Sequence, residues 1–165
     1  MLNPDDLTAA WVAKLQDIPA LVTALGGDPT RISGYVDRFP DKTSLGNTIL
    51  ARNPGSILVV YMGTFRTRIE RALAWKHSFS FHVKGPESVN GGVSYALIWW
   101  LFVNGIPATA NPGALKLLRF PIHEECYPMD LELPQSQRNQ ILVSPDGATM
   151  DVFEIQASLV EIGDN

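Results

Sequence analysis

The clearest pattern in the chain is an alternation of side chains between Leu73 and Lys84. Successive side chains of a β-strand point to opposite faces, so a period of two predicts one strand with two different faces. One face carries Leu73, Trp75, His77, Phe79, Phe81 and Val83, and the other carries Ala74, Lys76, Ser78, Ser80, His82 and Lys84. We expect the first face to cover a core and the second to meet water or a partner.

A second strand is predicted just before this one. Residues Ile57–Tyr61 form a continuous apolar, β-branched run after a turn signal, which is typical of a central strand. We expect the two strands to pair antiparallel, with the basic stretch Arg66–Arg71 connecting them. Arg66 and Arg68 alternate within that stretch, as they would on an ordinary solvated strand edge.

The N-terminal residues predict a helix. Asn3 is a suitable cap, Pro4 suits the first helical position, and apolar residues recur at helical spacing through Leu7, Trp11, Leu15, Ile18, Val22 and Leu25. Pro19 falls inside this pattern and is expected to break or bend the helix near Asp17. Gly26-Gly27 should end it.

Residues 28–55 are rich in turn formers and predict a partly ordered arm or loop. A short strand at Ile32–Val36 and one or two helical turns at Ser44–Arg52 fit the sequence best. Its apolar residues need a place to pack, and either the same subunit or a neighbouring subunit could provide it.

The C-terminal half predicts one helix and several strands. Val93–Asn104 is expected to be a buried helix, although periodicity leaves a strand open, and 106–114 a loop. Further strands are predicted at Leu117–His123, Gln140–Val143 and Met150–Ile162, the last two joined by a turn at Ser144–Gly147. The whole chain, 1–165, therefore predicts a single α+β domain in which an N-terminal and a central helix pack on a mainly antiparallel sheet.

Charge divides the chain into two unlike parts. Residues 42–84 carry seven basic residues against Glu70, a balance of +6, whereas residues 124–165 carry nine carboxylates against Arg138, a balance of −8. Patches of opposite sign suit head-to-tail docking between copies of one chain. The candidate subunit-interface residues are Arg66, Arg68, Arg71, Lys76, Glu154 and Glu161.

Composition narrows the function classes. The net charge of −4 argues against a general nucleic-acid binder. Cys126 is the only cysteine, which excludes an internal disulfide and fits a reducing compartment. The N-terminus has no secretory-signal pattern, and the longest apolar run, Ala96–Val103, is too short to span a bilayer. No membrane insertion is expected.

The strongest chemical cluster in the sequence is His123-Glu124-Glu125-Cys126. Imidazole, carboxylate and thiolate all bind zinc, but the paired ligand spacing of a zinc site is missing. A nucleophilic pair of Cys126 and His123 is a further alternative. His77 lies on the apolar face of its strand, where a core histidine is the simpler interpretation. His82 lies on the opposite face and cannot share a metal with His77. We therefore expect no catalytic, cofactor or metal site.

The segment from Ile18 to Tyr61 carries a family resemblance. It contains Ile18-Pro19-Ala20-Leu21-Val22, Leu25-Gly26-Gly27, Arg31-Ile32, Tyr35, Asp37-Arg38-Phe39-Pro40 and Ser44-Leu45 ahead of an apolar strand. This pattern resembles the tail-terminator proteins of long-tailed bacteriophages, also called tail completion or head–tail joining proteins. The order of elements is similar over most of the chain.

The resemblance implies a non-enzymatic virion protein at the tail–neck junction, assembled in the host cytoplasm as a homo-oligomeric, hexameric ring. Such a ring contacts the tail tube protein and a head–tail connector or neck protein. Genomic DNA passes through its lumen without specific binding, and an acidic wall would repel the phosphates. The alternatives are another head–tail connector or minor tail protein, and a small metal- or thiol-dependent enzyme.

Overall fold

The fold is given by a computed structural model that describes residues 1–35, 42–69, 72–84, 122–123, 126–132, 139–143 and 149–162. Its helices are α1 (Pro4–Gln16), α2 (Pro19–Ala24), the 3-10 turn η1 (Pro29–Arg31) and α3 (Lys42–Ala51). Its strands are β1 (Ile32–Gly34), β2 (Ser56–Ile69), β3 (Ala72–Lys84), β4 (Cys126–Glu132), β5 (Asn139–Val143) and β6 (Thr149–Ile162).

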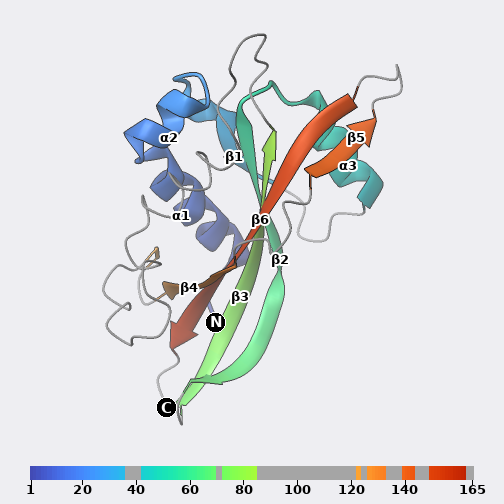
Figure 1. Ribbon diagram of the computed structural model, residues 1–165. Helices are drawn as coiled ribbons and strands as arrows, with labels where there is room; N and C mark the ends of the chain where they lie inside the picture. The colour runs from blue at the N-terminus through green and yellow to red at the C-terminus, as the bar shows by residue number, and fades with distance from the viewer. Residues whose placement is uncertain are drawn as a thin grey trace.

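The strands form one mixed sheet with the order β1-β2-β3-β6-β4, and β5 also pairs with β6. Only β1 and β2 are parallel among these pairs, and the others are antiparallel. The predicted α+β class with a mainly antiparallel sheet is therefore confirmed. The last strand, β6, lies between β3 on one side and both β4 and β5 on the other (Figure 1).

The helices α1 and α2 cover the first face of the sheet, as the apolar stripe predicted. The Asn3 side chain accepts a hydrogen bond from the Asp5 backbone N–H, and the break between α1 and α2 falls immediately before Pro19. Trp11 is fully buried against the edges of Phe79 and Phe81, with ring centroids 6.2 and 5.0 Å away. Aromatic pairs favour this edge-to-face arrangement.

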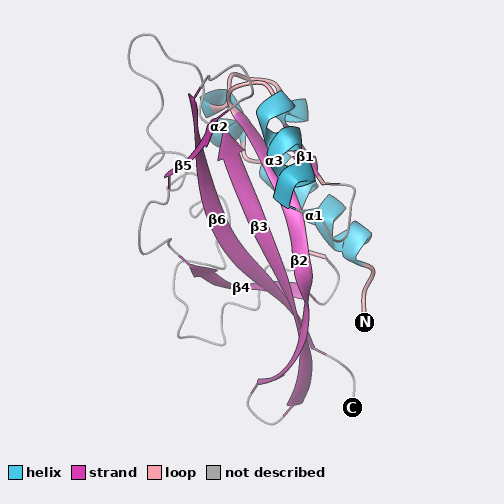
Figure 2. Ribbon diagram, turned by 90° about the vertical axis from the view of Figure 1, so that its right-hand side faces the viewer, coloured by secondary structure: helices cyan, strands magenta, loops and turns pink. Residues whose placement is uncertain are grey.

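The helix α3 lies on the opposite side of the sheet from α1 and α2 (Figures 1 and 2). Its Ile49 packs with Leu58 and Val60 of β2, so this part of 28–55 packs on the sheet of its own chain. The second face of β3 was expected to meet water or a partner, and for Ser80, His82 and Lys84 this is wrong because all three side chains are buried.

Lys84 shows how a charged group is accommodated on this covered face. Its Nζ donates hydrogen bonds to the carbonyl oxygens of Leu50, at 3.0 Å, and of Arg52. Both acceptors lie where α3 ends, and cations are stabilised at the C-terminal end of a helix. The lysine therefore ties the end of β3 to α3.

A β-bulge in β2 changes which side chains share a face. Tyr61 pairs with Phe79 but Gly63 pairs with Ser78, so Met62 is the extra residue. Gly63 has φ +133°, a backbone conformation that favours glycine. Because the bulge shifts the alternation by one position, Thr64 lies opposite His77 and on the same face of the sheet.

The β2–β3 hairpin extends to the end of the sheet farthest from α2 and α3 (Figure 2). β2 continues to Ile69, so Arg66 and Arg68 belong to the strand and not to the predicted connection. Leu73, expected to cover the core, is 44% exposed because it lies beyond Ala74, the last β3 residue that pairs with β6.

Strands β5 and β6 confirm the predicted C-terminal hairpin, since Gln140 pairs with Val152 in an antiparallel ladder. β4 was not predicted as a strand. The expected central helix Val93–Asn104, the loop 106–114 and the turn Ser144–Gly147 lie outside the described residues. So does the predicted strand Leu117–His123, except for Ile122 and His123.

Candidate functional site

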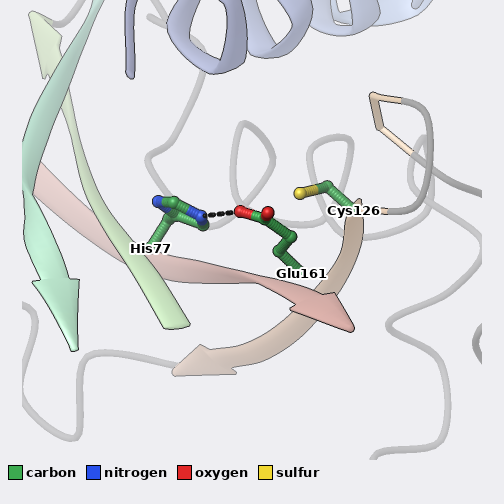
Figure 3. A group of neighbouring side chains, drawn as sticks. All are labelled: His77, Cys126 and Glu161. Carbon is green, nitrogen blue, oxygen red and sulfur yellow. Dashed lines mark hydrogen bonds and ion pairs between the residues drawn. The ribbon is translucent and has the colours of Figure 1, made fainter. Parts of the chain in front are cut away.

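Three neighbouring strands bring one histidine, one cysteine and one glutamate together on the first face of the sheet (Figure 3). Glu161 of β6 pairs with Trp75 on one side and with Cys126 of β4 on the other. His77 lies two residues beyond Trp75 and therefore on the same face of β3. One nitrogen, one sulfur and one oxygen from the three side chains all lie within 4.8 Å of one another.

Both ring nitrogens of the fully buried His77 have partners. Its Nε2 lies 2.9 Å from Glu161 Oε2, and its Nδ1 lies 3.0 Å from Thr64 Oγ1, which also contacts the Tyr61 hydroxyl. The prediction that His77 is a buried core histidine is confirmed. The two hydrogen bonds hold the imidazole in one orientation, with Nε2 towards Glu161.

Glu161 is held by the N-terminal residues as well as by His77. Its Oε2 accepts a hydrogen bond of 2.9 Å from the Leu2 backbone N–H, and its Oε1 lies 3.1 Å from the Met1 amino group. Burial opposes ionisation of this carboxyl, but the hydrogen bonds from Leu2 and His77 and the nearby amino group outweigh that effect. The pKa of Glu161 therefore lies below its ordinary value.

Cys126, at the start of β4, forms no disulfide and has no exposed surface. Its N–H donates to the carbonyl oxygen of His123 at 2.6 Å, and Ile122 N–H donates to the Cys126 carbonyl at 2.8 Å. These bonds pair His123 with Cys126 at the start of β4. The Cys126 sulfur lies close to the ligand atoms of His77 and Glu161. Among the described residues, His123 does not belong to this group.

A second polar cluster lies on the opposite face of the sheet. Ser80 Oγ donates to Glu154 Oε1 at 2.6 Å and lies 3.2 Å from His82 Nε2. In a serine nucleophile site the carboxylate orients the histidine, whereas here it binds the serine hydroxyl, so this is not such a relay. Burial lowers the pKa of His82, and the Glu154 carboxylate opposes that shift only in part.

The predicted interface residues occupy different environments. Arg66 and Arg68 are exposed on the outer part of the β2–β3 hairpin, with Arg66 Cζ 5.5 Å from the centroid of the Trp75 ring. Lys76 and Glu154 are half-buried, and Arg71 lies outside the described residues. Glu161 is buried, and its carboxylate contacts His77 and the Met1 amino group of the same chain.

The β2–β3 hairpin also exposes apolar side chains, from the bulge at Met62 to its outer part. Met62, Phe65 and Leu73 are 55%, 60% and 44% exposed, and Met1 is the fourth large apolar residue exposed in the described part of the chain. Phe65 pairs with Lys76 and Leu73 with Arg68, which places the two apolar side chains on opposite faces of the hairpin. Sequence alternation predicted the strand and placed Leu73 on its buried face. Leu73 is nevertheless exposed, because β6 ends before it reaches this residue.

No protein-family model matches this chain, and no curated protein or solved structure matches it either. None of the helices within the described ranges has both the length and the apolar character needed to cross a bilayer.

Proposed function

We propose that this chain is a structural subunit that assembles head-to-tail into a ring, and that the ring is the tail terminator of a long-tailed bacteriophage. In this role the ring, a hexamer as the family resemblance implies, caps the tail tube and joins it to the neck of the capsid. Genomic DNA passes through its lumen. The work of such a protein is assembly and not turnover.

The observation that carries this proposal is the exposed outer part of the β2–β3 hairpin. Phe65 and Leu73 expose apolar surface there, one on each face, and Arg66 and Arg68 lie beside them. Phe65 and Leu73 lie on opposite faces of the hairpin. A single partner can cover both side chains only if it contacts both faces of the hairpin. A neighbouring subunit that surrounds a projecting hairpin satisfies this requirement.

Charge supports a second copy of the chain as that partner. The hairpin surface presents Arg66 and Arg68, whereas residues 124–165 have a balance of −8. The basic hairpin and the acidic segment 124–165 are different parts of one chain, so contact between them would be heterologous, and repetition of a heterologous contact produces a ring when the rotation closes. Complementary charges favour encounter and fix the orientation of the subunits.

The oligomeric state of the purified full chain tests the first half of the proposal. We expect mass photometry and negative-stain microscopy to show rings for the unchanged chain. The double substitution Arg66→Glu and Arg68→Glu should shift the population to monomers, most strongly at low ionic strength, where exposed charges are least screened. Lys14→Glu on α1 is the control, because it reverses a charge outside the hairpin. Monomers of the unchanged chain at every concentration, or equal effects of both variants, would refute this ring interface.

The second half, the role at the end of a tail, needs a different measurement. A terminator should bind one end of purified tail tubes and stop their further growth, which electron microscopy records as capped tubes of uniform length. Rings that bind isolated necks but leave tube growth unchanged would point to another head–tail joining subunit. Rings that bind neither structure would refute the virion role.

A further inference from the structure

We propose that His77, Cys126 and Glu161 form a zinc-binding site that joins β3, β4 and β6. The proposal does not rest on the ring function, because all three ligands come from one chain. It concerns a buried metal site with three protein ligands, namely Nε2 of His77, the Cys126 sulfur and a Glu161 oxygen.

The donor set favours zinc over magnesium and calcium. Thiolate and imidazole are preferred zinc ligands, whereas magnesium and calcium take oxygen ligands almost exclusively. Zinc carries two positive charges, and the Cys126 thiolate with the Glu161 carboxylate supplies two negative ones. The ion and its three ligands would therefore together be neutral, which matters because His77 and Cys126 have no exposed surface, whereas the Met1 amino group beside Glu161 is exposed to solvent.

The geometry is close to what a tetrahedral ion requires. Ligand atoms around zinc lie roughly 3.3–3.8 Å apart, given bond lengths of about 2.0–2.3 Å. The three candidate atoms already lie within 4.8 Å of one another, and His77 Nε2 is 2.9 Å from Glu161 Oε2. Since adjacent strands hold all three side chains, small side-chain rotations suffice to close the site.

The surroundings supply the outer hydrogen bonds that metal ligands use. When a histidine binds a metal through one nitrogen, its other nitrogen normally donates to an oxygen, which fixes the ring. Thr64 Oγ1 lies 3.0 Å from His77 Nδ1 and can accept that hydrogen bond, leaving Nε2 for the ion. The Leu2 N–H on Glu161 Oε2 holds the carboxylate in the same way.

Binding has a definite proton balance. The Cys126 thiol gives up its proton to solvent when the sulfur becomes a ligand, and His77 must be neutral. The three protein ligands leave a fourth position of the tetrahedron for a water molecule or another group. The expected effect is to fasten β4 and β6 to β3 on the face that α1 covers.

Cobalt(II) is the spectroscopic probe, because tetrahedral cobalt bound to a thiolate absorbs visible light and shows a sulfur-to-metal charge-transfer band in the near ultraviolet. We expect the full chain, stripped of metal with a chelator, to take up about one cobalt ion per chain with these bands, and zinc to displace the cobalt and remove them. Cys126→Ser should abolish the charge-transfer band. Thr64→Val should weaken affinity by about 10- to 100-fold while keeping the band, as loss of an outer hydrogen bond does.

His82→Gln is the matched control, since it removes a buried histidine of the same strand from the opposite face. It should leave the spectrum and the affinity unchanged. Circular dichroism of each metal-free variant identifies any that fails to fold, and Cys126→Ser and Thr64→Val are near-isosteric substitutions that are expected to keep the fold. Absence of the charge-transfer band in the unchanged chain, or its persistence in Cys126→Ser, would overturn the proposal.

Discussion

Replacing Gly63 with alanine tests whether the bulge in β2 depends on a backbone conformation that glycine adopts without strain. Gly63 has φ +133°, and a Cβ built there meets no atom within 4 Å. The substitution therefore adds no clash, and its effect comes from the backbone alone. Strained conformations of this kind cost about 1–3 kcal/mol for other residues, while alanine gains about 0.4–1 kcal/mol by restricting the unfolded chain. We expect a net destabilisation of about 1–2 kcal/mol.

Gly46 provides the matched control. A Cβ at Gly46 also meets nothing within 4 Å, but this glycine lies inside α3 with an ordinary φ. Alanine is preferred over glycine in a helix interior by about 1 kcal/mol, so Gly46→Ala should stabilise the protein. The same change, in equally open space, should then separate the two variants by about 2–3 kcal/mol.

Urea unfolding followed by circular dichroism measures both variants. With m values of about 1–3 kcal/mol/M, the two midpoints should differ by roughly 1 M or more. A Gly63→Ala midpoint equal to or above that of the unchanged chain would show that the bulge relaxes without strain. The reasoning that connects Gly63 to the placement of Thr64 would then be wrong.

Two further predictions concern the two faces of the sheet. Trp11→Ala should lower the free energy of unfolding by about 3–5 kcal/mol in urea titrations, because it empties a fully buried site against Phe79 and Phe81; a loss below 1 kcal/mol would mean that the core refills the space. The pKa of His82 is lowered in the folded state, so on acidification this histidine is protonated in the unfolded chain first. The free energy of unfolding should therefore decrease as the pH falls below about 6.5, by at most about 1.4 kcal/mol per pH unit. His82→Gln should flatten this slope relative to the unchanged chain, and an identical slope in both would refute the assignment.

Local sequence patterns predicted the elements whose cause is local. The cap at Asn3, the break before Pro19, the alternation of β3 and the β5–β6 hairpin all follow from neighbouring residues. Long-range pairing was not predictable in this way. Nothing near Cys126 indicates that its strand pairs with β6, and the hypothesis therefore joined Cys126 to His123 instead of to His77 and Glu161.

Two errors in predicting exposure have the same physical origin. Alternation identifies which side chains share a face, but it does not tell whether another element covers that face. α3 lies over the second face, so Lys84 is buried, whereas β6 stops short of Leu73 and leaves it exposed. The bulge beside Gly63 also reverses which face of the sheet the β2 side chains beyond Tyr61 occupy. A single glycine after an apolar run was too weak a signal to predict this reversal.

The position of β6 has a consequence for how the molecule acquires its fold. Its ladder with β3 joins residues as distant in sequence as His82 and Glu154, and β4 and β5 depend on the same strand for their pairing. A ribosome delivers β6 after every other described element, so β3, β4 and β5 must wait with open edges until it emerges. Folds dominated by such distant contacts form slowly, and their unpaired strands are prone to associate with other chains in the interval.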